Sequence, residues 1–313
     1  MFILLSLALA ADRVEEASTL ALGSSAVAAP DENSSIAANP GVIGLSERYH
    51  FSLGFGYGGR GIHWNLTALD SHTTSVAFGM SYSGDRFNPP LETYELPGYQ
   101  VPGETIRNLK FTHDIGFALA IPTTDRRFSG GLGGSVSFFN NDRQGQGITW
   151  NLSGGLGFRP IKSLVLGVSA RNFVPTRFKT NPPPQDVSVL LPVGNPAGAR
   201  PFELLLGARL GDDRVGAIIL EGGARPLRAA PLVLAAGAEV YVDTTSIRAG
   251  WRLENGTHQA SIGVGAGAKD ARIDLAWMVP ILSIGRPVDW TLALSVRFKG
   301  PDPDSINPDN RFD

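Results

Sequence analysis

The last predicted strand of the chain, residues 290–299, alternates between two kinds of side chain. Its even positions, such as Leu292, Leu294 and Phe298, are large and apolar, whereas its odd positions, such as Ser295 and Arg297, are small or polar. Successive side chains of a β-strand point to opposite faces of the sheet. This strand therefore has one apolar face and one polar face.

The same period-two pattern recurs along most of the chain and predicts about fourteen strands. They cover residues 51–57, 62–68, 76–82, 111–121, 128–138, 148–159, 164–171, 202–210, 215–224, 232–242, 247–253, 261–265, 272–279 and 290–299. Repeated alternation with little else between the strands is typical of a barrel whose apolar face meets lipid and whose polar face meets the lumen. We therefore predict an all-β fold, an antiparallel transmembrane β-barrel over residues 46–299. The alternative fold is a soluble all-β protein.

The lengths of the connections support the strand count and the topology. The two longest connections, about 85–110 and 175–199, follow the third and seventh predicted strands, which are both odd-numbered. The connections after even-numbered strands are short, as at 70–72 and 160–163. Outer-membrane barrels have short periplasmic turns and longer outer loops. This sorting predicts a barrel with an even number of strands in the outer membrane of a Gram-negative bacterium.

Composition excludes several other classes of protein. The net charge of −2 is not that of a nucleic-acid-binding protein. The chain has no cysteine, which excludes disulfides and thiolate metal sites. Past the N-terminus there is no run of eighteen apolar residues of the length that a membrane-spanning helix needs. We expect no cofactor and no nucleic-acid partner.

The two ends of the chain differ from the strands between them. Residues 1–10 form a short apolar stretch with small residues at Ala8 and Ala10, followed by acidic residues, and predict a secretory signal peptide without its usual basic start. Residues 300–313 are rich in Pro and Asp and predict a polar tail that folds poorly.

The polar face of the predicted strands consists mainly of small residues with spaced charges. Small inward residues are expected to leave room inside the barrel. The charged positions on this face are Asp114, Arg171, Glu203, Arg209, Glu239, Arg248, Arg252, Arg272, Asp274 and Arg297. One interpretation is a lumen wall whose arginines pair with its carboxylates. The other is a ligand path with a basic track that orients an anionic head group.

Residues 11–45 precede the first strand and lack its alternation. They are rich in Ala, Ser, Asn and Pro, and part of the segment could form a short helix. Such a stretch could hang in the periplasm or fold into the lumen as a plug. We assign it as an N-terminal hatch because of a motif that it contains.

This segment resembles the N-terminal hatch of the FadL superfamily of outer-membrane proteins. The resemblance lies in Leu22-Gly23, a run of small residues, the acidic pair Asp31-Glu32, and then Asn39-Pro40-Gly41 before the first strand. The motif common to the superfamily is Asn-Pro-Ala-Gly. In this chain the Ala is absent, and Gly41 follows Pro40 directly. The resemblance implies a monomeric fourteen-strand barrel with an N-terminal plug. In transporters of this superfamily, apolar substrates enter the lumen and leave sideways through a gap in the wall.

Two functions follow from the resemblance. The first is a FadL-like outer-membrane channel for small hydrophobic or amphipathic molecules. The alternative is a scaffold or shuttle for protein secretion or surface attachment, like the PorV-like members of the superfamily, whose partner would be a secreted or envelope protein. The short chain and the proline-rich stretch 181–184 favour this alternative. In both cases outer-membrane lipid surrounds the barrel.

No catalytic or metal-binding motif stands out from this pattern. The five histidines include no pair at helical metal-binding spacing, and the chain has no Gly-x-Ser-x-Gly elbow and no phosphate-binding loop. His63 falls on the inward face and His113 on the apolar face. A single lumenal histidine is usually a polar wall residue, and we predict that the protein is not an enzyme.

Overall fold

A computed structural model of the chain describes residues 16–58, 61–87, 109–141, 145–173, 179–181, 202–212, 215–224, 232–254, 257–268, 271–282 and 290–300. The predicted signal peptide at 1–10, residues 11–15 of the predicted hatch and residues 301–313 of the predicted tail lie outside these ranges.

The described residues form strands and three short helical turns. The helical turns come first and are α1 (Ala17–Ala21), α2 (Ser35–Ala38) and the 3₁₀-helix η2 (Val42–Leu45). The strands are β1 (Tyr49–Gly58), β2 (Gly61–Asp70), β3 (Ala77–Phe87), β4 (Leu109–Pro122), β5 (Phe128–Asn141), β6 (Gly145–Ile161), β7 (Leu164–Arg171), β8 (Lys179–Asn181), β9 (Glu203–Asp212), β10 (Gly216–Ala224), β11 (Leu232–Val242), β12 (Thr245–Glu254), β13 (Thr257–Gly267), β14 (Ala271–Leu282) and β15 (Thr291–Lys299).

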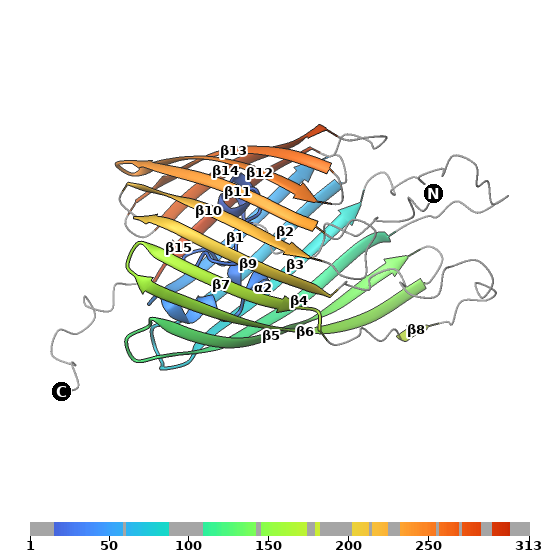
Figure 1. The fold of residues 1–313 in the computed structure, drawn as a ribbon. Helices are drawn as coiled ribbons and strands as arrows, with labels where there is room; N and C mark the ends of the chain where they lie inside the picture. Colours follow the sequence, from blue (N-terminus) through green and yellow to red (C-terminus); the bar gives the residue numbers. More distant parts are fainter. Residues whose placement is uncertain are drawn as a thin grey trace.

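The strands close into a single antiparallel barrel (Figure 1). Each strand pairs with its neighbours in the chain, and β1 pairs with β15 from His50–Lys299 to Gly58–Thr291. The short strand β8 only extends the ladder beside β6, so fourteen strands form the wall. Closure leaves no unpaired edge, which a sheet in lipid cannot tolerate. The predicted fold class is confirmed.

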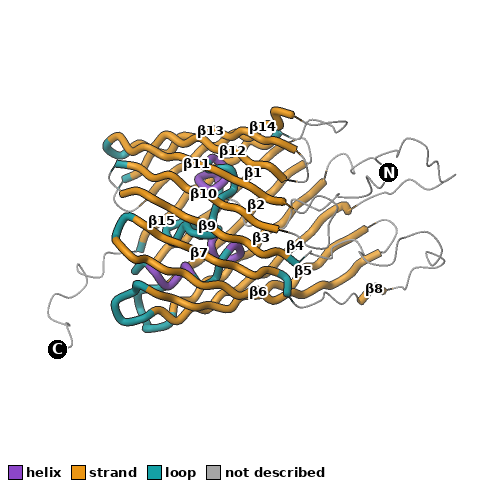
Figure 2. Tube along the Cα trace, viewed as in Figure 1, coloured by secondary structure: helices purple, strands orange, loops and turns teal. Residues whose placement is uncertain are grey.

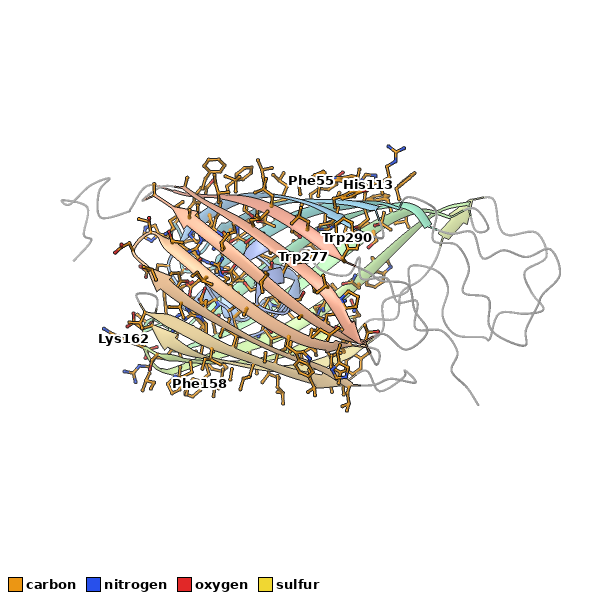
Figure 3. The ribbon with its side chains drawn as sticks, turned by 90° about the horizontal axis from the view of Figure 1, so that it is seen from above. Phe55, His113, Phe158, Lys162, Trp277 and Trp290 are labelled. Atoms are coloured by element: carbon orange, nitrogen blue, oxygen red, sulfur yellow. The ribbon has the colours of Figure 1, made fainter. Side chains whose placement is uncertain are left out.

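The last strand shows that the alternation determines which side chains face outward. In β15, Leu292, Leu294 and Phe298 are 44–45% exposed, whereas Ser295 and Arg297 are only 2% and 7% exposed. Large apolar side chains are likewise exposed along the other strands, and Figure 3 shows Phe55, Phe158 and Trp277 on the outside of the barrel. A continuous apolar surface of this kind requires an apolar solvent, which for a closed barrel is lipid.

The two ends of the barrel differ in their connections. The turns 71–76, 123–127, 162–163 and 243–244 lie at one end, here named the short-turn end. The opposite end, named the long-connection end, is where β3 leads to β4 across 88–108 and β7 leads to β9 across 172–202. The two longest connections therefore lie at the same end, as predicted, and the described connections at the other end are short.

The chain before β1 lies inside the barrel rather than beside it. Figure 2 shows the helical turns enclosed by strands, and α1, α2 and η2 all contact the inner wall. Residues 16–48 are here named the N-terminal segment. Among the described residues, no helix has the length and apolar character needed to cross a membrane.

Candidate functional site

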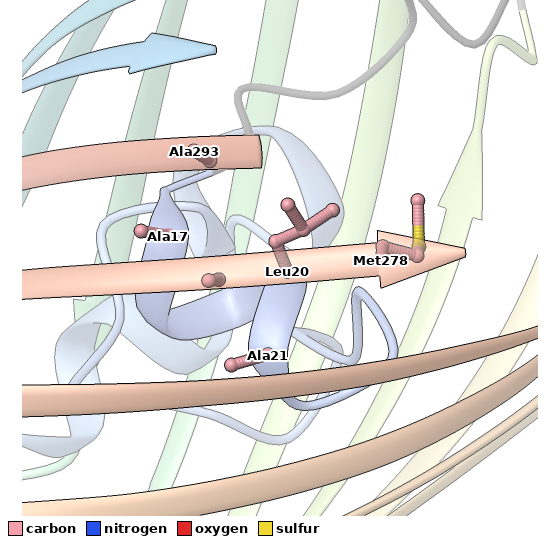
Figure 4. Packing of buried hydrophobic residues seen from close by; sticks show 6 residues of the cluster. Ala17, Leu20, Ala21, Met278 and Ala293 are labelled. Carbon is pink, nitrogen blue, oxygen red and sulfur yellow. The ribbon is translucent and has the colours of Figure 1, made fainter. Parts of the chain in front are cut away.

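The N-terminal segment fills the lumen and touches the wall on several sides. On one side, α1 packs against β13, β14 and β15, where Leu20 lies in a buried cluster with Met278 and Ala293 (Figure 4). Across the lumen, α2 and η2 pack against β3 to β6, where Ile36 and Ile43 lie in a buried cluster with Ala118 of β4. Helices of four and five residues are not stable alone. Burial against the wall therefore accounts for their formation.

Inward apolar residues on the remaining strands complete this packing. The predicted strand 215–224 breaks the alternation at Ile218, Ile219 and Leu220. In β10, Ile218 and Leu220 are each 55% exposed to the outside, whereas Ile219 is 1% exposed and packs on Leu22. The break in the pattern is thus a contact with the N-terminal segment.

Glycines on the inner wall form the seat of the segment. A Cβ atom at Gly131 would lie 2.6 Å from the Pro40 carbonyl carbon, and one at Gly155 would overlap the side-chain oxygen of Asn39. The wall positions where an added Cβ would meet the N-terminal segment in this way are Gly79, Gly131, Gly155, Gly157, Gly167, Gly207, Gly237, Gly250 and Gly263, here named the seat glycines. The small inward residues were predicted to leave room, and that room holds the N-terminal segment.

The Asn39-Pro40-Gly41 motif is the tightest part of this contact. The Asn39 side-chain nitrogen donates to the Val27 carbonyl at 2.8 Å and to the Leu156 carbonyl of β6 at 3.1 Å. The Asn39 side-chain oxygen accepts from the Gly41 N–H at 3.0 Å. Asn39 is fully buried, so each of these bonds satisfies a group that water cannot reach. The motif thus links two parts of the segment to the wall.

Arg297 holds the other half of the segment through two buried carboxylates. Its guanidinium pairs with Glu16 at 2.5 Å and with Glu32, and it also donates to the Ser18 hydroxyl and the Asp31 carbonyl. Glu16 is 1% exposed and Glu32 is 8% exposed. Buried ions of this kind remain charged only when each has a partner.

Arg297 and Arg252 both contact the N-terminal segment. The lumen-wall interpretation paired the inward arginines with carboxylates on the strands, whereas Arg297 pairs with carboxylates of the N-terminal segment. Arg252 pairs with Glu254 at 2.7 Å and lies 3.5 Å from the Ser24 carbonyl. Neither Glu16 nor Glu32 was among the predicted site residues, because alternation identifies wall residues only.

The other predicted lumen charges form pairs within the wall. Arg171 pairs with Glu203 at 2.9 Å, and the Asp114 carboxylate accepts from the Ser137 hydroxyl. A connected group spans β9 to β14, with the pairs Arg209–Glu239 at 3.6 Å, Arg248–Glu239 at 3.1 Å, Arg248–Asp274 at 2.6 Å and Arg272–Asp274 at 2.9 Å. Arg209 also lies 3.9 Å from Asp31 of the segment.

Side chains that the sequence reasoning missed bind the backbone of the segment. The Glu221 carboxylate accepts from the N–H groups of Ala26 and Val27 at 3.1 and 3.2 Å. The Ser261 hydroxyl donates to the Ala21 carbonyl at 3.0 Å and accepts from the Gly23 N–H at 3.2 Å. These contacts join residues far apart in the chain, which no local pattern reports.

Arg126 binds the end of the N-terminal segment, next to the start of β1. It lies in the 123–127 turn and donates to the Glu47 carboxylate at 2.9 Å, the Gly44 carbonyl at 3.0 Å and the Ser71 carbonyl at 2.7 Å. Three bonds from one guanidinium fix the start of β1 relative to this turn. The segment is therefore anchored at the short-turn end.

The two histidines discussed above lie where the sequence placed them. His63 faces the lumen, with its Nδ1 atom 2.7 Å from Asp85, and Thr112 donates to the same carboxylate at 3.0 Å. His113 lies on the outer face, as Figure 3 shows. Within the described residues, no group of three or more metal-binding side chains comes together.

The ion pair between Glu32 and Arg297 makes the attachment of the N-terminal segment to the wall dependent on pH. Burial would raise its pKa, but the charges of Arg297 and Arg248 and a hydrogen bond from Ser18 outweigh burial and lower the pKa from 4.5 to about 2. A pKa that is lower in the folded state gives stability that is present above the unfolded pKa and is lost as the pH falls through the folded pKa.

We therefore expect the N-terminal segment to loosen as the pH falls from 4.5 toward about 2. The measurement is the ionic conductance of the purified barrel in planar bilayers across this window, where a loosened segment would raise the current. The Glu32→Gln variant cannot titrate at this position, so its current should change less. A wild-type current that stays constant throughout the window would contradict the expectation.

Solved structures, but not family profiles or curated sequences, resemble this protein. No protein-family profile matches the sequence, and no curated protein matches it. Solved structures do match, among them the toluene transporter TodX of Pseudomonas putida, with a TM-score of 0.63, 12% identity, and coverage of 91% of this chain and 97% of TodX. The toluene transporter TbuX of Ralstonia pickettii matches with a TM-score of 0.60, 14% identity, and coverage of 91% and 98%.

A FadL homologue of Pseudomonas aeruginosa also matches, with a TM-score of 0.62, 11% identity, and coverage of 90% of this chain and 98% of that protein. The chain has the FadL-type barrel fold. The likeness extends over most of the chain, so the FadL-type fold includes the described wall from β1 to β15. At 11–14% identity it establishes the fold and not the substrate.

Proposed function

We propose that this protein is an outer-membrane channel for small hydrophobic or amphipathic molecules, in which the N-terminal segment is a hatch. The observation that carries the proposal is a closed barrel whose lumen is filled by its own N-terminal segment. The segment is held by ion pairs, hydrogen bonds and small-residue contacts, all of which are reversible. The similar fold of TodX and TbuX, which are named as toluene transporters, supports a hydrophobic cargo.

The apolar outer face supports a location in the outer membrane. A single chain closes the wall without an unpaired edge, which supports a monomer surrounded by lipid. In this arrangement the short-turn end faces the periplasm and the long-connection end faces outward. The proposed function is transport and includes no catalytic step. The comparisons give no support to the secretion-scaffold alternative.

The proposed route runs along the barrel axis past the hatch. The resemblance implied an exit sideways through a gap in the wall. Over the described residues, the registers of β1–β2, β2–β3, β3–β4 and β1–β15 run without interruption. The wall between these strands therefore offers no gap, and displacement of the hatch is the step that would open a path. Arg209, Arg252 and Arg297 would then line that path and could contact the polar end of an amphipathic molecule.

A reversible disulfide between hatch and wall tests the proposal. A Cβ atom at Gly207 would lie 3.2 Å from the Cβ of Ala28, close to the spacing of about 3.5–4.5 Å in native disulfides. The chain has no cysteine, so Ala28→Cys with Gly207→Cys introduces the only thiol pair. We expect cells that depend on this barrel to take up labelled toluene when the pair is reduced and to stop when it is oxidised.

The two single-cysteine variants are the matched controls, because neither can form the crosslink, and Gly207→Cys also shows what the added Cβ at a seat glycine does by itself. Uptake that continues when the disulfide is formed would overturn the role of the hatch. Absence of uptake in the wild-type protein, for toluene and for a medium-chain fatty acid alike, would overturn the channel itself.

A further inference from the structure

Among its described strand residues, the outer face of the barrel carries one arginine in a largely apolar surface. Arg86 lies near the end of β3 and is exposed. Among the outward-facing strand positions whose side chains the structure describes, Arg86 alone is an arginine or lysine. Its register partners Ile62 and Phe111 are outward-facing and apolar. A cation in this position is exceptional for this wall.

Polar and aromatic side chains cluster around His113 on the same outer face, and the cluster includes Phe111, a register partner of Arg86. The Tyr82 hydroxyl lies 2.8 Å from Nδ1 of His113, and the two rings stack with their centroids 6.0 Å apart. The rings of Trp64 and Phe111 lie 5.9 and 5.3 Å from His113. The set Trp64, Tyr82, Arg86, Phe111 and His113 is here named the outer-wall patch.

The register brings these five residues together. Gly84 lies opposite both Trp64 and His113, and a Cβ atom at Gly84 would overlap the Trp64 indole ring. Because Gly84 has no side chain, the Trp64 indole can lie over β3 at this position. Arg86 is the next residue of β3 on the same outward face. Diagonal neighbours of this kind in a sheet lie about 7–8 Å apart at Cα, within reach of an arginine side chain.

The patch lies at the long-connection end of the barrel, where aromatic side chains mark the boundary between lipid and water. A guanidinium fits a phosphate because it offers paired N–H donors with the right spacing. Arg86 is exposed on the outward face of β3, and no ion pair of Arg86 occurs within the described residues, so its guanidinium is available to the surrounding lipid. Anionic lipid is the complementary partner available there.

We propose that the outer-wall patch binds the phosphorylated headgroup of an outer-leaflet glycolipid, with Arg86 contacting the phosphate. Trp64 and Phe111 pack against the acyl and sugar portion, and the Tyr82–His113 pair borders the headgroup. The site lies outside the lumen and is separate from the transport path. The inference rests on the proposed outer-membrane orientation, because the long-connection end must face the outer leaflet.

The test is native mass spectrometry of the full-length barrel in mild detergent with added diphosphoryl lipid A. We expect one lipid A to bind per barrel, and Arg86→Gln to weaken binding about tenfold or more, the order expected when a charge-assisted phosphate contact is lost. Arg127→Gln is the matched control, because Arg127 is an exposed arginine (68%) in a turn at the short-turn end. It should bind lipid A as the wild type does.

Three results would overturn the proposal. They are unchanged binding in Arg86→Gln, equal weakening in Arg127→Gln, and a preference for phosphatidylglycerol over lipid A. Lipid binding is measured without any transport substrate, so its outcome is independent of the uptake experiment. Loss of uptake with lipid A binding intact would overturn the channel and leave this site in place.

Discussion

Replacement of Arg297 by methionine is expected to release the N-terminal segment and turn a closed barrel into a leaky one. The substitution keeps an unbranched, uncharged stem but removes the guanidinium, which leaves Glu16 and Glu32 buried without their cation. Removing one partner of a buried ion pair typically costs about 3–5 kcal/mol. This cost falls on the contact between hatch and wall, so the segment should leave the lumen. The measurement is the baseline conductance of single barrels in planar bilayers.

A second buried pair provides the control for this experiment. Arg171 and Glu203 are as buried as Arg297, but their pair at 2.9 Å joins β7 to β9. Arg171→Met should lower the temperature at which the barrel unfolds on a gel without raising its conductance. Adding Glu16→Gln and Glu32→Gln to Arg297→Met removes the stranded charges and should reduce the leak. A conductance of Arg297→Met equal to that of the wild type would contradict the assigned role.

Gly155→Ala is expected to displace the hatch, whereas Gly154→Ala, one residue away, is expected to have no such effect. An added Cβ at Gly155 would overlap the Asn39 side chain and lie 3.2 Å from the Gly41 nitrogen. At Gly154 the nearest atoms would be 3.5 and 3.6 Å away, in Leu132 and Phe173, which is ordinary contact. Overpacking a tight site typically costs about 1–3 kcal/mol.

Each variant adds one methyl group, and the two differ only in the face of β6 that carries it. We expect Gly155→Ala to raise baseline conductance and Gly154→Ala to behave as the wild type, with both barrels folded on a gel. Equal conductance in the two variants would show that Asn39 does not need its close contact with β6.

The strands and their faces were predictable because their signal is local. Each strand carries its own period-two pattern, so β15 could be identified from residues 290–299 without reference to any other part of the chain. The parity of the connection lengths then indicated the even number of strands. The same pattern placed His63 inward and His113 outward, and the structure agrees.

The contents of the lumen were much less predictable. The Asn39-Pro40-Gly41 motif indicated a hatch by resemblance alone, and its bonds to Val27 and Leu156 appear only in three dimensions. The inward charges were assigned to the correct face, yet Arg297 has partners that precede it by more than 260 positions in the sequence. Charge and burial do not specify a partner when several carboxylates face the same space.

The sequence by itself therefore determined the barrel, its strand number and which side chains meet lipid, since backbone geometry turns a local alternation directly into two faces. Only the tertiary structure decided what occupies the lumen. Because a glycine has no side chain, the sequence gives no sign of whether it borders empty space or the backbone of another segment. The packing of the N-terminal segment against distant strands explains three features that the sequence leaves unexplained. They are the seat glycines, the inward Ile219 and the five-residue helix α1.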